Sequence, residues 1–581
     1  MRGDGRDGWL RVPVGAEAVR WTTRGRCKLV LLVVHNVTSA TRLLDVLPLF
    51  RDDLRVQLLA TCTGSSPFRS GVAELLAAVG VPVVPWEQAL ALPVDLAVSA
   101  SFGGELHALK GALTVLSHGV GYNKRLAAPG GGQSAPDAPQ GQAPVFGLSP
   151  DWLLHQGATV ADTLVLSHPE QRDRLRAACP EALPTALLAG DPCYDRLLGA
   201  RQYRARFRRA LDVRAGQRLV VLNSTWNPES LFGDGGAADV LPSLLPRLAS
   251  ELPADEYRIA AVLHPNIWHG HGPGQVRAWL DGAVRGGLVL VDPLEGWRQA
   301  LVAADAVIGD FGSVSYYAAA LGTPVLLAAD APDRLDPASP VAAFARQAPR
   351  LAPGAPLLGQ LDALIGGHRR PAGPGRLVSS APGRSAALLR RHFYGRLGVP
   401  EPPGPALRDP LPLPPYEAAV RTAPLRVLTR VRGPREVEVA RYADPAREPR
   451  GGGSRHTAVD EDTLDPGRLG LADVILRHGA ADDPRFGGPA GWAAEVHERH
   501  PGCALAAYVT GPGTCVAVDR AGREFAVTAD PAGPEPGVYA SALYAVLAGG
   551  ARPEALAAGL TVVTGGSVHH ARVSPGPAPG R

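Results

Sequence analysis

Apolar runs that alternate with helical patterns dominate the first 330 residues of the chain. From Lys28 onward, strand-like runs such as KLVLLVVHN and RVQLLATC are each followed by a segment with the spacing of an amphipathic helix. Strands that alternate with helices connect by right-handed crossovers, which produce a parallel sheet covered on both faces. The pattern therefore predicts an α/β fold built from Rossmann-like domains.

The alternation runs through two successive series. The first occupies residues 1–200, with a helix expected over 41–50 and a Gly/Pro/Gln-rich loop over 128–143. The second occupies residues 201–399 and ends in a helix over 386–397 that we expect to fold back over the first domain. Two such domains that face each other place strand carboxyl ends along a shared cleft, which is where ligands bind in open α/β sheets.

A proline-rich spacer separates this part of the chain from a further unit. Residues 400–424 include PEPPGPALRDPLPLPP, which cannot form a regular core. Residues 425–581 combine strand-like runs with two helical patterns, and a hairpin is expected at Arg520–Arg523. We expect a smaller α+β domain there, of unknown role and without a chemical motif.

Composition narrows the classes of function. The length of 581 residues suits roughly three or four domains, and a net charge of +4 is too weak to indicate nucleic-acid binding. Six cysteines without a CxxC pair indicate neither a zinc site nor a disulfide framework. With no signal-peptide core and no apolar segment near the roughly 20 residues of a membrane helix, we expect a cytoplasmic protein. The Arg201–Arg209 segment leaves open either peripheral contact with anionic lipid at the inner face of the membrane or a solvated helix face.

The strongest candidate for chemistry lies between Ala306 and Pro324. A buried strand ends before Asp310, small polar residues open a helix, and Gly322-Thr323-Pro324 closes it. Free backbone N–H groups and the positive end of the helix dipole suit a diphosphate at such a start. We expect Gly312, Ser313 and Ser315 to bind it, whereas Asp310 either orients a catalytic histidine or caps the helix.

Three other strand ends carry polar residues. His118 follows the strand ALTVL and can act as a general base or can simply bond a neighbouring loop. Thr225 and Trp226 follow the first strand of the second series, where they offer a hydroxyl and an aromatic face to a nucleotide. His264 ends the next strand, and because the nearby histidines lack a helix or a carboxylate to complete a site, we expect no metal. No cofactor is implied.

In order and spacing, these positions resemble the CDP-glycerol glycerophosphotransferases that build teichoic acid polymers, a family with the glycosyltransferase-B fold. The HPN sequence, the segment 310–313 and LGTPVL are also similar to the UDP-N-acetylglucosamine 2-epimerases. The first resemblance covers roughly residues 28–330 and rests on His118-Gly119 with Lys124, Gly190-Asp191-Pro192-Cys193-Tyr194-Asp195, Thr225-Trp226, His264-Pro265 and Asp310-Phe311-Gly312-Ser313.

The resemblance implies a transferase that takes a nucleotide-diphosphate donor, CDP-glycerol or a nucleotide sugar. It would move a glycerol-phosphate or glycosyl group to a hydroxyl acceptor (a polyol, a sugar or a polymer) in cell-envelope or polymer biosynthesis. His118 would deprotonate the acceptor, and His264 would donate a hydrogen bond to the leaving phosphate. The donor or its phosphates would be bound by Lys124, Thr225, Trp226, Gly312, Ser313 and Ser315.

Departures from the family pattern keep two further hypotheses open. Val120-Gly121-Tyr122-Asn123 precedes Lys124, Asn227 replaces a basic residue, and Gly312 replaces a serine. One alternative is epimerisation or hydrolysis of a UDP-sugar, which needs a carboxylate base such as Asp95, Glu105 or Asp191. The other is a catalytically silent nucleotide-sugar binding protein.

Overall fold

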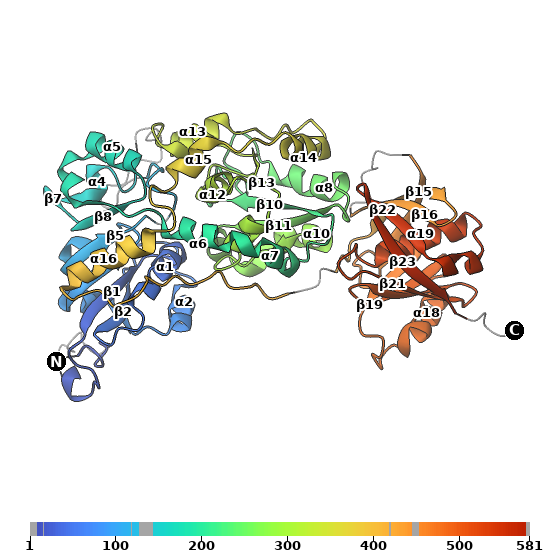
Figure 1. Cartoon of the computed structure of the whole chain (residues 1–581), viewed down its shortest axis with the longest axis horizontal. Coiled ribbons are helices and arrows are strands. Elements are labelled where there is room, and N and C mark those ends of the chain that lie inside the picture. Colours follow the sequence, from blue (N-terminus) through green and yellow to red (C-terminus); the bar gives the residue numbers. More distant parts are fainter. Residues whose placement is uncertain are drawn as a thin grey trace.

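The first Rossmann-like domain is a parallel sheet between two layers of helices (Figure 1). The computed structural model describes residues 8–15, 17–117, 119–126, 143–416, 420–443 and 452–576, so most of the expected loop over 128–143 lies outside them. The strand order is β3-β2-β1-β4-β5-β8-β9. The strands are β1 (Lys28–Val34), β2 (Val56–Cys62), β3 (Val83–Val84), β4 (Pro93–Ser99), β5 (Lys110–Val115), β8 (Thr163–Leu166) and β9 (Ala186–Leu188); a small hairpin pairs β6 (Leu154–His155) with β7 (Ala158–Thr159).

Alternate residues of β1 enter two separate cores, as a strand with a period of two requires. Val30 and Leu32 pack on one face of the sheet, and Leu31 and Val33 pack on the other. The helix expected over 41–50 begins earlier, because the side chain of Asn36 accepts a hydrogen bond from Ser39 N and caps it. The helices of this part are α1 (Val37–Leu44), α2 (Val72–Val79), α3 (Trp86–Ala91), α4 (Pro150–Leu153), α5 (Pro169–Ala178) and α6 (Pro192–Ala200).

The second Rossmann-like domain repeats the plan with the strand order β12-β11-β10-β13-β14, all parallel. Its strands are β10 (Arg218–Ser224), β11 (Tyr257–Leu263), β12 (Val289–Leu290), β13 (Ala306–Gly309) and β14 (Val325–Leu327). The helices around them are α7 (Arg204–Ala210), α8 (Leu241–Glu251), α9 (Pro265–His271), α10 (Pro273–Arg285), α11 (Trp297–Ala303), α12 (Ser313–Leu321), α13 (Pro340–Gln347), α14 (Leu357–Gly366) and α15 (Ala372–Leu377).

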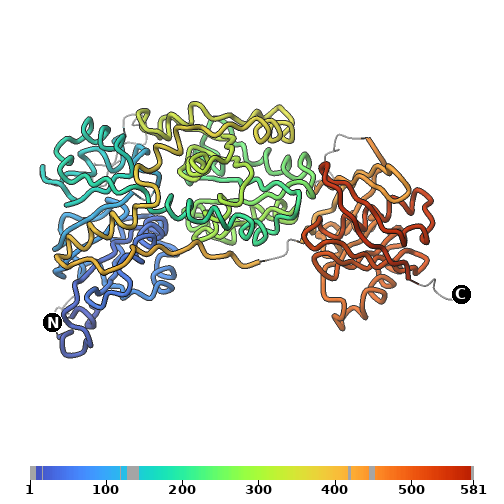
Figure 2. Tube along the Cα trace, viewed as in Figure 1, coloured from blue at the N-terminus to red at the C-terminus, as the bar shows by residue number. Residues whose placement is uncertain are grey.

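The chain then returns to the first domain. Helix α16 (Ser385–Leu397) buries Leu389 and Phe393 in the same core as Val30 of β1. Figure 2 shows this helix and the segment after it running back along the first domain. Within residues 400–416 and 420–424 the proline-rich segment that follows has neither helix nor strand, and Gln299 donates to the carbonyl of Pro412. The domain boundaries at 200, 399 and 424 stay predictions.

The appended unit is a closed mixed barrel wrapped around helix α19 (Gly537–Ala548), which confirms a third α+β part (Figure 1). Antiparallel pairing of β15 with both β16 and β17 closes it. Helices α17 (Pro466–Gly470) and α18 (Gly488–Arg499) belong to the same part. The strands are β15 (Leu425–Gly433), β16 (Glu436–Tyr442), β17 (Ser454–Asp460), β18 (Val474–His478), β19 (Leu505–Gly511), β20 (Thr514–Asp519), β21 (Glu524–Ala529), β22 (Leu560–Thr564) and β23 (Ser567–Pro575).

A buried ion pair joins the barrel to the second domain. The guanidinium of Arg441 donates to both carboxylate oxygens of Asp255 at 2.7 and 2.8 Å, and to Glu535 at 2.6 Å. The N–H of Ala254 donates to the carbonyl of Arg441 at 2.7 Å. Asp255 precedes β11, so the barrel contacts the amino ends of the strands and leaves their carboxyl ends to the first domain.

Helix α7 contains part of the Arg-rich segment for which the sequence allows either lipid contact or a solvated helix face. Arg204 and Arg208 both donate to the carboxylate of Asp305, at 2.6 and 2.7 Å. These two side chains therefore bind α7 to its own domain. No helix in the described ranges has the length and the apolar character needed to cross a bilayer.

Candidate functional site

The two Rossmann-like domains meet through main-chain pairing near the carboxyl ends of their strands. Residue Lys124, in the loop after β5, forms an antiparallel bridge with Leu335, in the loop after β14. Arg125 N donates to the carbonyl of Arg334 at 2.9 Å, and Asp336 N donates to that of Asn123 at 2.8 Å. Backbone from the second domain therefore sets the position of Lys124.

The junction of residues 123–125 with residues 334–336 is called the seam. Lys124 crosses the seam, and its ammonium group contacts the second domain. Its Nζ donates to Thr225 Oγ1 at 3.0 Å and to Asn227 Oδ1 at 3.2 Å, and lies 5.8 Å from the ring centre of Phe311. Burial lowers the pKa of Lys124 to about 8, partly opposed by the negative charge of Asp310. Asn227 therefore supplies an acceptor for the ammonium of Lys124.

Asp310 holds together the loops that follow β10 and β13. Its Oδ2 accepts hydrogen bonds from Thr225 N at 2.8 Å and Leu231 N at 3.2 Å, and its Oδ1 accepts one from Gly312 N at 3.0 Å. Burial raises the pKa of Asp310, against the effect of these N–H groups. The carboxylate therefore organises the backbone around the start of α12.

Gly312 is the N-cap residue of α12, and space explains the glycine. Its φ of −76° suits any residue, but a Cβ atom would lie 3.0 Å from Asp310 Oδ1 and 3.1 Å from Thr225 Cβ. A serine would crowd both neighbours. The close approach of Thr225 therefore favours glycine at this position.

The two serines of α12 face different surroundings. Ser313 Oγ accepts a hydrogen bond from Val120 N of the first domain at 3.3 Å, so it lies at the seam. Ser315 is fully buried, and its Oγ accepts from Asn223 Nδ2 at 2.9 Å. The structure thus brings Lys124, Thr225 and Ser313 to the seam, whereas Ser315 packs against β10.

His264 and Trp226 also contact the first domain. His264 caps α9 by accepting from Asn266 N at its Nδ1, at 3.1 Å, and its Nε2 lies 3.4 Å from the Thr38 hydroxyl. Trp226 meets Phe68 edge to face, with ring centres 5.2 Å apart. His118 lies outside the described residues.

The two histidines that follow His264 have separate surroundings. The ring of His269 lies against Gly71 at the start of α2 and leaves no room for a Cβ there. The ring of His271 meets Trp279 with centres 4.9 Å apart.

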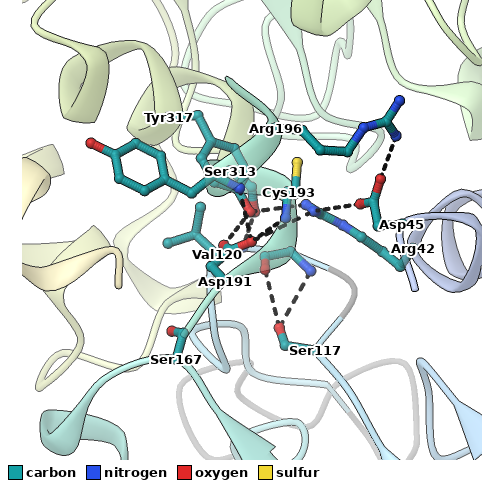
Figure 3. Close-up of polar contacts among 12 residues, drawn as sticks. Arg42, Asp45, Ser117, Val120, Ser167, Asp191, Cys193, Arg196, Ser313 and Tyr317 are labelled. Atoms are coloured by element: carbon teal, nitrogen blue, oxygen red, sulfur yellow. Dashed lines mark hydrogen bonds and ion pairs between the residues drawn. The ribbon is translucent and has the colours of Figure 1, made fainter. Parts of the chain in front are cut away.

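A buried cluster of charges beside the seam escaped the sequence analysis (Figure 3). Asp45, in the turn after α1, accepts hydrogen bonds from Arg196 at 2.5 Å and from Arg298 at 3.0 Å. Burial alone would raise the pKa of Asp45, but Arg298 and Arg196 outweigh it and hold the pKa below its ordinary value. An aspartate inside the apolar run RLLDVLPLF was the available signal, because a carboxylate buried there requires cations.

The same cluster reaches helix α12. Arg42 donates to the Tyr317 hydroxyl at 3.0 Å, and that hydroxyl donates to Asp191 Oδ2 at 2.6 Å. Tyr317 stands one helical turn after Ser313, and Figure 3 shows both side chains close to Asp191. The cluster therefore connects α1 of the first domain to the helix whose start lies at the seam.

Two Rossmann-like domains that face each other define the architecture of glycosyltransferase-B proteins. No family model matches the chain, and no curated protein matches its sequence. Among solved structures, the chain is similar to the wall teichoic acid polymerase TagF, with 14% identity, a TM-score of 0.40, and coverage of 64% of this chain and 88% of that one.

Two solved UDP-GlcNAc 2-epimerases are also similar. The one from Methanocaldococcus jannaschii, in complex with UDP-GlcNAc and UDP, has 11% identity and a TM-score of 0.41 over 63% of this chain and 100% of that one. The one from Neisseria meningitidis, bound to UDP-GlcNAc, has 12% identity and a TM-score of 0.37 over 64% and 99%.

Proposed function

We propose that the protein is a transferase that binds a nucleotide-diphosphate donor at the seam. It moves a glycerol-phosphate or glycosyl group from CDP-glycerol or a nucleotide sugar to a hydroxyl acceptor, in cell-envelope or polymer biosynthesis. The observation that carries the proposal is the contact of Lys124 with Thr225, because it holds a partly buried cation from one domain beside the start of α12 in the other.

The chemistry of these groups suits a diphosphate. Lys124 is partly buried, so an anion that reaches it gains more than it would from a fully solvated lysine. The Thr225 hydroxyl and the first N–H groups of α12 add donors, and the dipole of this nine-residue helix favours negative charge at its start. Asp310 is the opposing charge, and its oxygens are engaged by backbone N–H groups.

His264 suits the role of hydrogen-bond donor to the leaving phosphate. Its Nδ1 accepts from Asn266 N, which leaves the proton of the neutral ring on Nε2, on the side of Thr38. His118 keeps the role of general base as a prediction from sequence. In glycerol-phosphate transfer the acceptor oxygen bonds to the distal phosphorus and CMP leaves; in glycosyl transfer it bonds to the anomeric carbon and the nucleoside diphosphate leaves.

The three carboxylates that could act as the base of a UDP-sugar epimerase or hydrolase either have protein partners of their own or are exposed. Asp95 accepts from Lys28 Nζ and Leu29 N, both at 2.8 Å, at the amino end of β1. Asp191 is bonded to Tyr317, and Glu105 is exposed. These contacts favour the transferase. One observation supports the alternative of a catalytically silent binding protein. Ser313 and Lys124 already form hydrogen bonds within the protein, to Val120 N and to the Thr225 hydroxyl.

A thermal-shift panel followed by product analysis tests the proposal. CDP, CDP-glycerol, UDP, UDP-N-acetylglucosamine and GDP are added to wild type, Thr225→Val and Ser313→Ala. A ligand at a hundred times its dissociation constant adds about 2.7 kcal/mol of stability, which is visible as a raised Tm. We expect one donor class to raise the Tm of wild type and to do so less in both variants. Release of CMP or of a nucleoside diphosphate with a hydroxyl acceptor then identifies the group transferred; binding without release would favour the silent protein, and no shift would overturn donor binding.

A further inference from the structure

An ion pair between Arg334 and Glu229 borders the seam. Arg334 lies in the loop after β14, and Glu229 lies in the loop after β10. The Nε and Nη2 atoms of Arg334 both donate to one oxygen of Glu229, Oε1, at 3.2 and 2.8 Å. The two side chains are 22% and 16% exposed, so a solute can reach the pair from solvent.

The main chain of Arg334 belongs to the seam itself. Its carbonyl accepts the hydrogen bond from Arg125 N at 2.9 Å, and the next residue, Leu335, pairs with Lys124. The guanidinium is therefore attached to backbone that is fixed beside Lys124. A change of the Arg334 side chain leaves these main-chain contacts in place.

Charge from the pair reaches the ammonium of Lys124. Burial is the largest cause of the lowered pKa of Lys124, Arg334 lowers that pKa further, and Glu229 acts in the opposite direction. Like charges repel, so two cations at this separation are stable together only with anions nearby. Glu229 is the carboxylate that pairs with the second of these cations.

A single cation neutralises only part of the charge of a diphosphate, and the loop after β10 contains no lysine or arginine from Thr225 to Phe232. Arg334 is a second cation within electrostatic reach of Lys124. Among the described residues, its guanidinium donates to Glu229 Oε1 alone, although a guanidinium has five N–H donors. Arg334 therefore retains donors for a phosphate.

Arg174, another arginine near the seam, has different surroundings. Its guanidinium donates to the carbonyl of Tyr122 at 2.6 Å, to Glu170 at 2.8 Å and to Asp336 at 2.9 Å. The side chain is only 10% exposed. Arg174 is thus held by the fold, whereas Arg334 is held by one exchangeable carboxylate oxygen.

We propose that the Glu229 carboxylate holds the place of a donor phosphate on Arg334, and that Arg334 binds this phosphate when the donor displaces Glu229. The proposal rests on the proposed donor site, to which it adds a second cation and a competitor within the protein. The arginine fork matches phosphate oxygens, with which it forms bidentate bonds. The guanidinium stays paired in both states, and the released carboxylate of Glu229 is near enough to the surface to be hydrated.

The two members of the pair should then affect binding in opposite directions. Arg334→Met removes a phosphate ligand and weakens binding, whereas Glu229→Gln removes the competing charge and strengthens it. An ion pair that only stabilises the two loops predicts that both substitutions weaken binding. The sign of the Glu229→Gln effect therefore distinguishes the two roles.

Isothermal titration of the full chain with CDP and with UDP tests the proposal. For the nucleotide that wild type binds, we expect affinity to be at least about tenfold weaker in Arg334→Met and about threefold tighter or more in Glu229→Gln. Arg334→Lys, which keeps the charge and loses the fork, should lie between wild type and Arg334→Met. Arg285→Met is the matched control and should bind as wild type does, because Arg285 also pairs with one carboxylate, that of Asp281 at 2.9 Å, at the end of α10 that precedes β12.

Two results would overturn this proposal while the donor site at Lys124 stands. These are wild-type affinity in Arg334→Met, or weaker binding in both Arg334→Met and Glu229→Gln. Absence of binding by wild type to either nucleotide would overturn the donor site and this proposal together. Matching thermal transitions verify that the variants fold, as expected from side chains whose replacement spares the backbone of the seam.

Discussion

The ammonium of Lys124 lies 3.0 Å from the hydroxyl of Thr225, and the two residues belong to different Rossmann-like domains. The contact depends on the backbone pairing of residue 124 with Leu335, which also joins the domains. The Lys124 ammonium, the Thr225 hydroxyl and the start of α12 thus lie close together, and the proposed donor site requires this arrangement.

Affinity for the donor should fall as pH rises through about 8. The ammonium of Lys124 carries its proton below its lowered pKa and loses it above, so the attraction for phosphate weakens between pH 7 and 9. We expect affinity at pH 9 to be about tenfold weaker than at pH 7. Isothermal titration at the two pH values measures this. In Lys124→Met the difference should vanish, and an equal pH dependence in that variant would assign it to another group.

Gly312→Ala should destabilise the protein by about 1–3 kcal/mol, because the new methyl group crowds Asp310 and Thr225. Urea unfolding measures the change. Gly359→Ala in α14 is the matched control. Among the described residues, nothing lies within 4 Å of the position that its Cβ would take, so this variant should gain about 0.5–1 kcal/mol. Equal effects of the two substitutions would contradict the tight approach at Gly312.

Tyr317→Phe should cost about 1–3 kcal/mol, since it removes the hydroxyl that links Arg42 to Asp191 and leaves a buried carboxylate oxygen without that donor. Tyr316→Phe on the same helix is the control. The Tyr316 hydroxyl is buried and has no hydrogen-bond partner among the described residues, so its removal should be neutral or stabilising. Chemical denaturation of both variants tests the difference, and a neutral Tyr317→Phe would refute the link.

The barrel should lose stability at alkaline pH, because His478 then loses the proton on which its stabilising contacts depend. Burial would lower its pKa, but hydrogen bonds to Asp460 at 3.1 Å and Glu535 at 3.2 Å raise the pKa of His478 to about 9. Its contribution is complete below the unfolded value near 6.5 and is lost as pH rises to about 9. The loss is on the order of 3 kcal/mol.

Unfolding free energies at about pH 6.5 and about pH 9 check this prediction. His478→Gln should remove most of the difference that wild type shows between the two values. The exposed His570 provides a control, and His570→Gln should keep the full pH dependence. A His478→Gln variant that responds to pH as wild type does would contradict the assignment.

The two Rossmann-like domains were predictable because parallel strands buried on both faces leave long apolar runs between helical patterns. The closed barrel was not predictable in the same way. Its closure depends on β15 pairing with both β16 and β17, and on β16 pairing with β22, which lies far along the chain. Alternation within a strand indicates which side chains are buried but not which strand lies beside it.

The candidate site was predictable in part. Thr225, His264 and Ser313 follow strand ends, and the structure brings them to the seam with Lys124. Ser315 was expected beside them, but a helix rotates by about 100° per residue, which turns its side chain toward Asn223. The cluster around Asp45 was missed because its arginines resemble the many others in an arginine-rich sequence.

The affinity of Lys124→Met for the donor tests the central claim most directly. Isothermal titration at about pH 7, with the nucleotide that gives the largest thermal shift, compares it with wild type and with Lys110→Met, an exposed lysine at the start of β5. The account predicts at least about tenfold weaker binding for Lys124→Met, from loss of a partly buried charge-assisted contact, and unchanged binding for Lys110→Met. Equal affinity of all three proteins would contradict a donor site at Lys124 and Thr225.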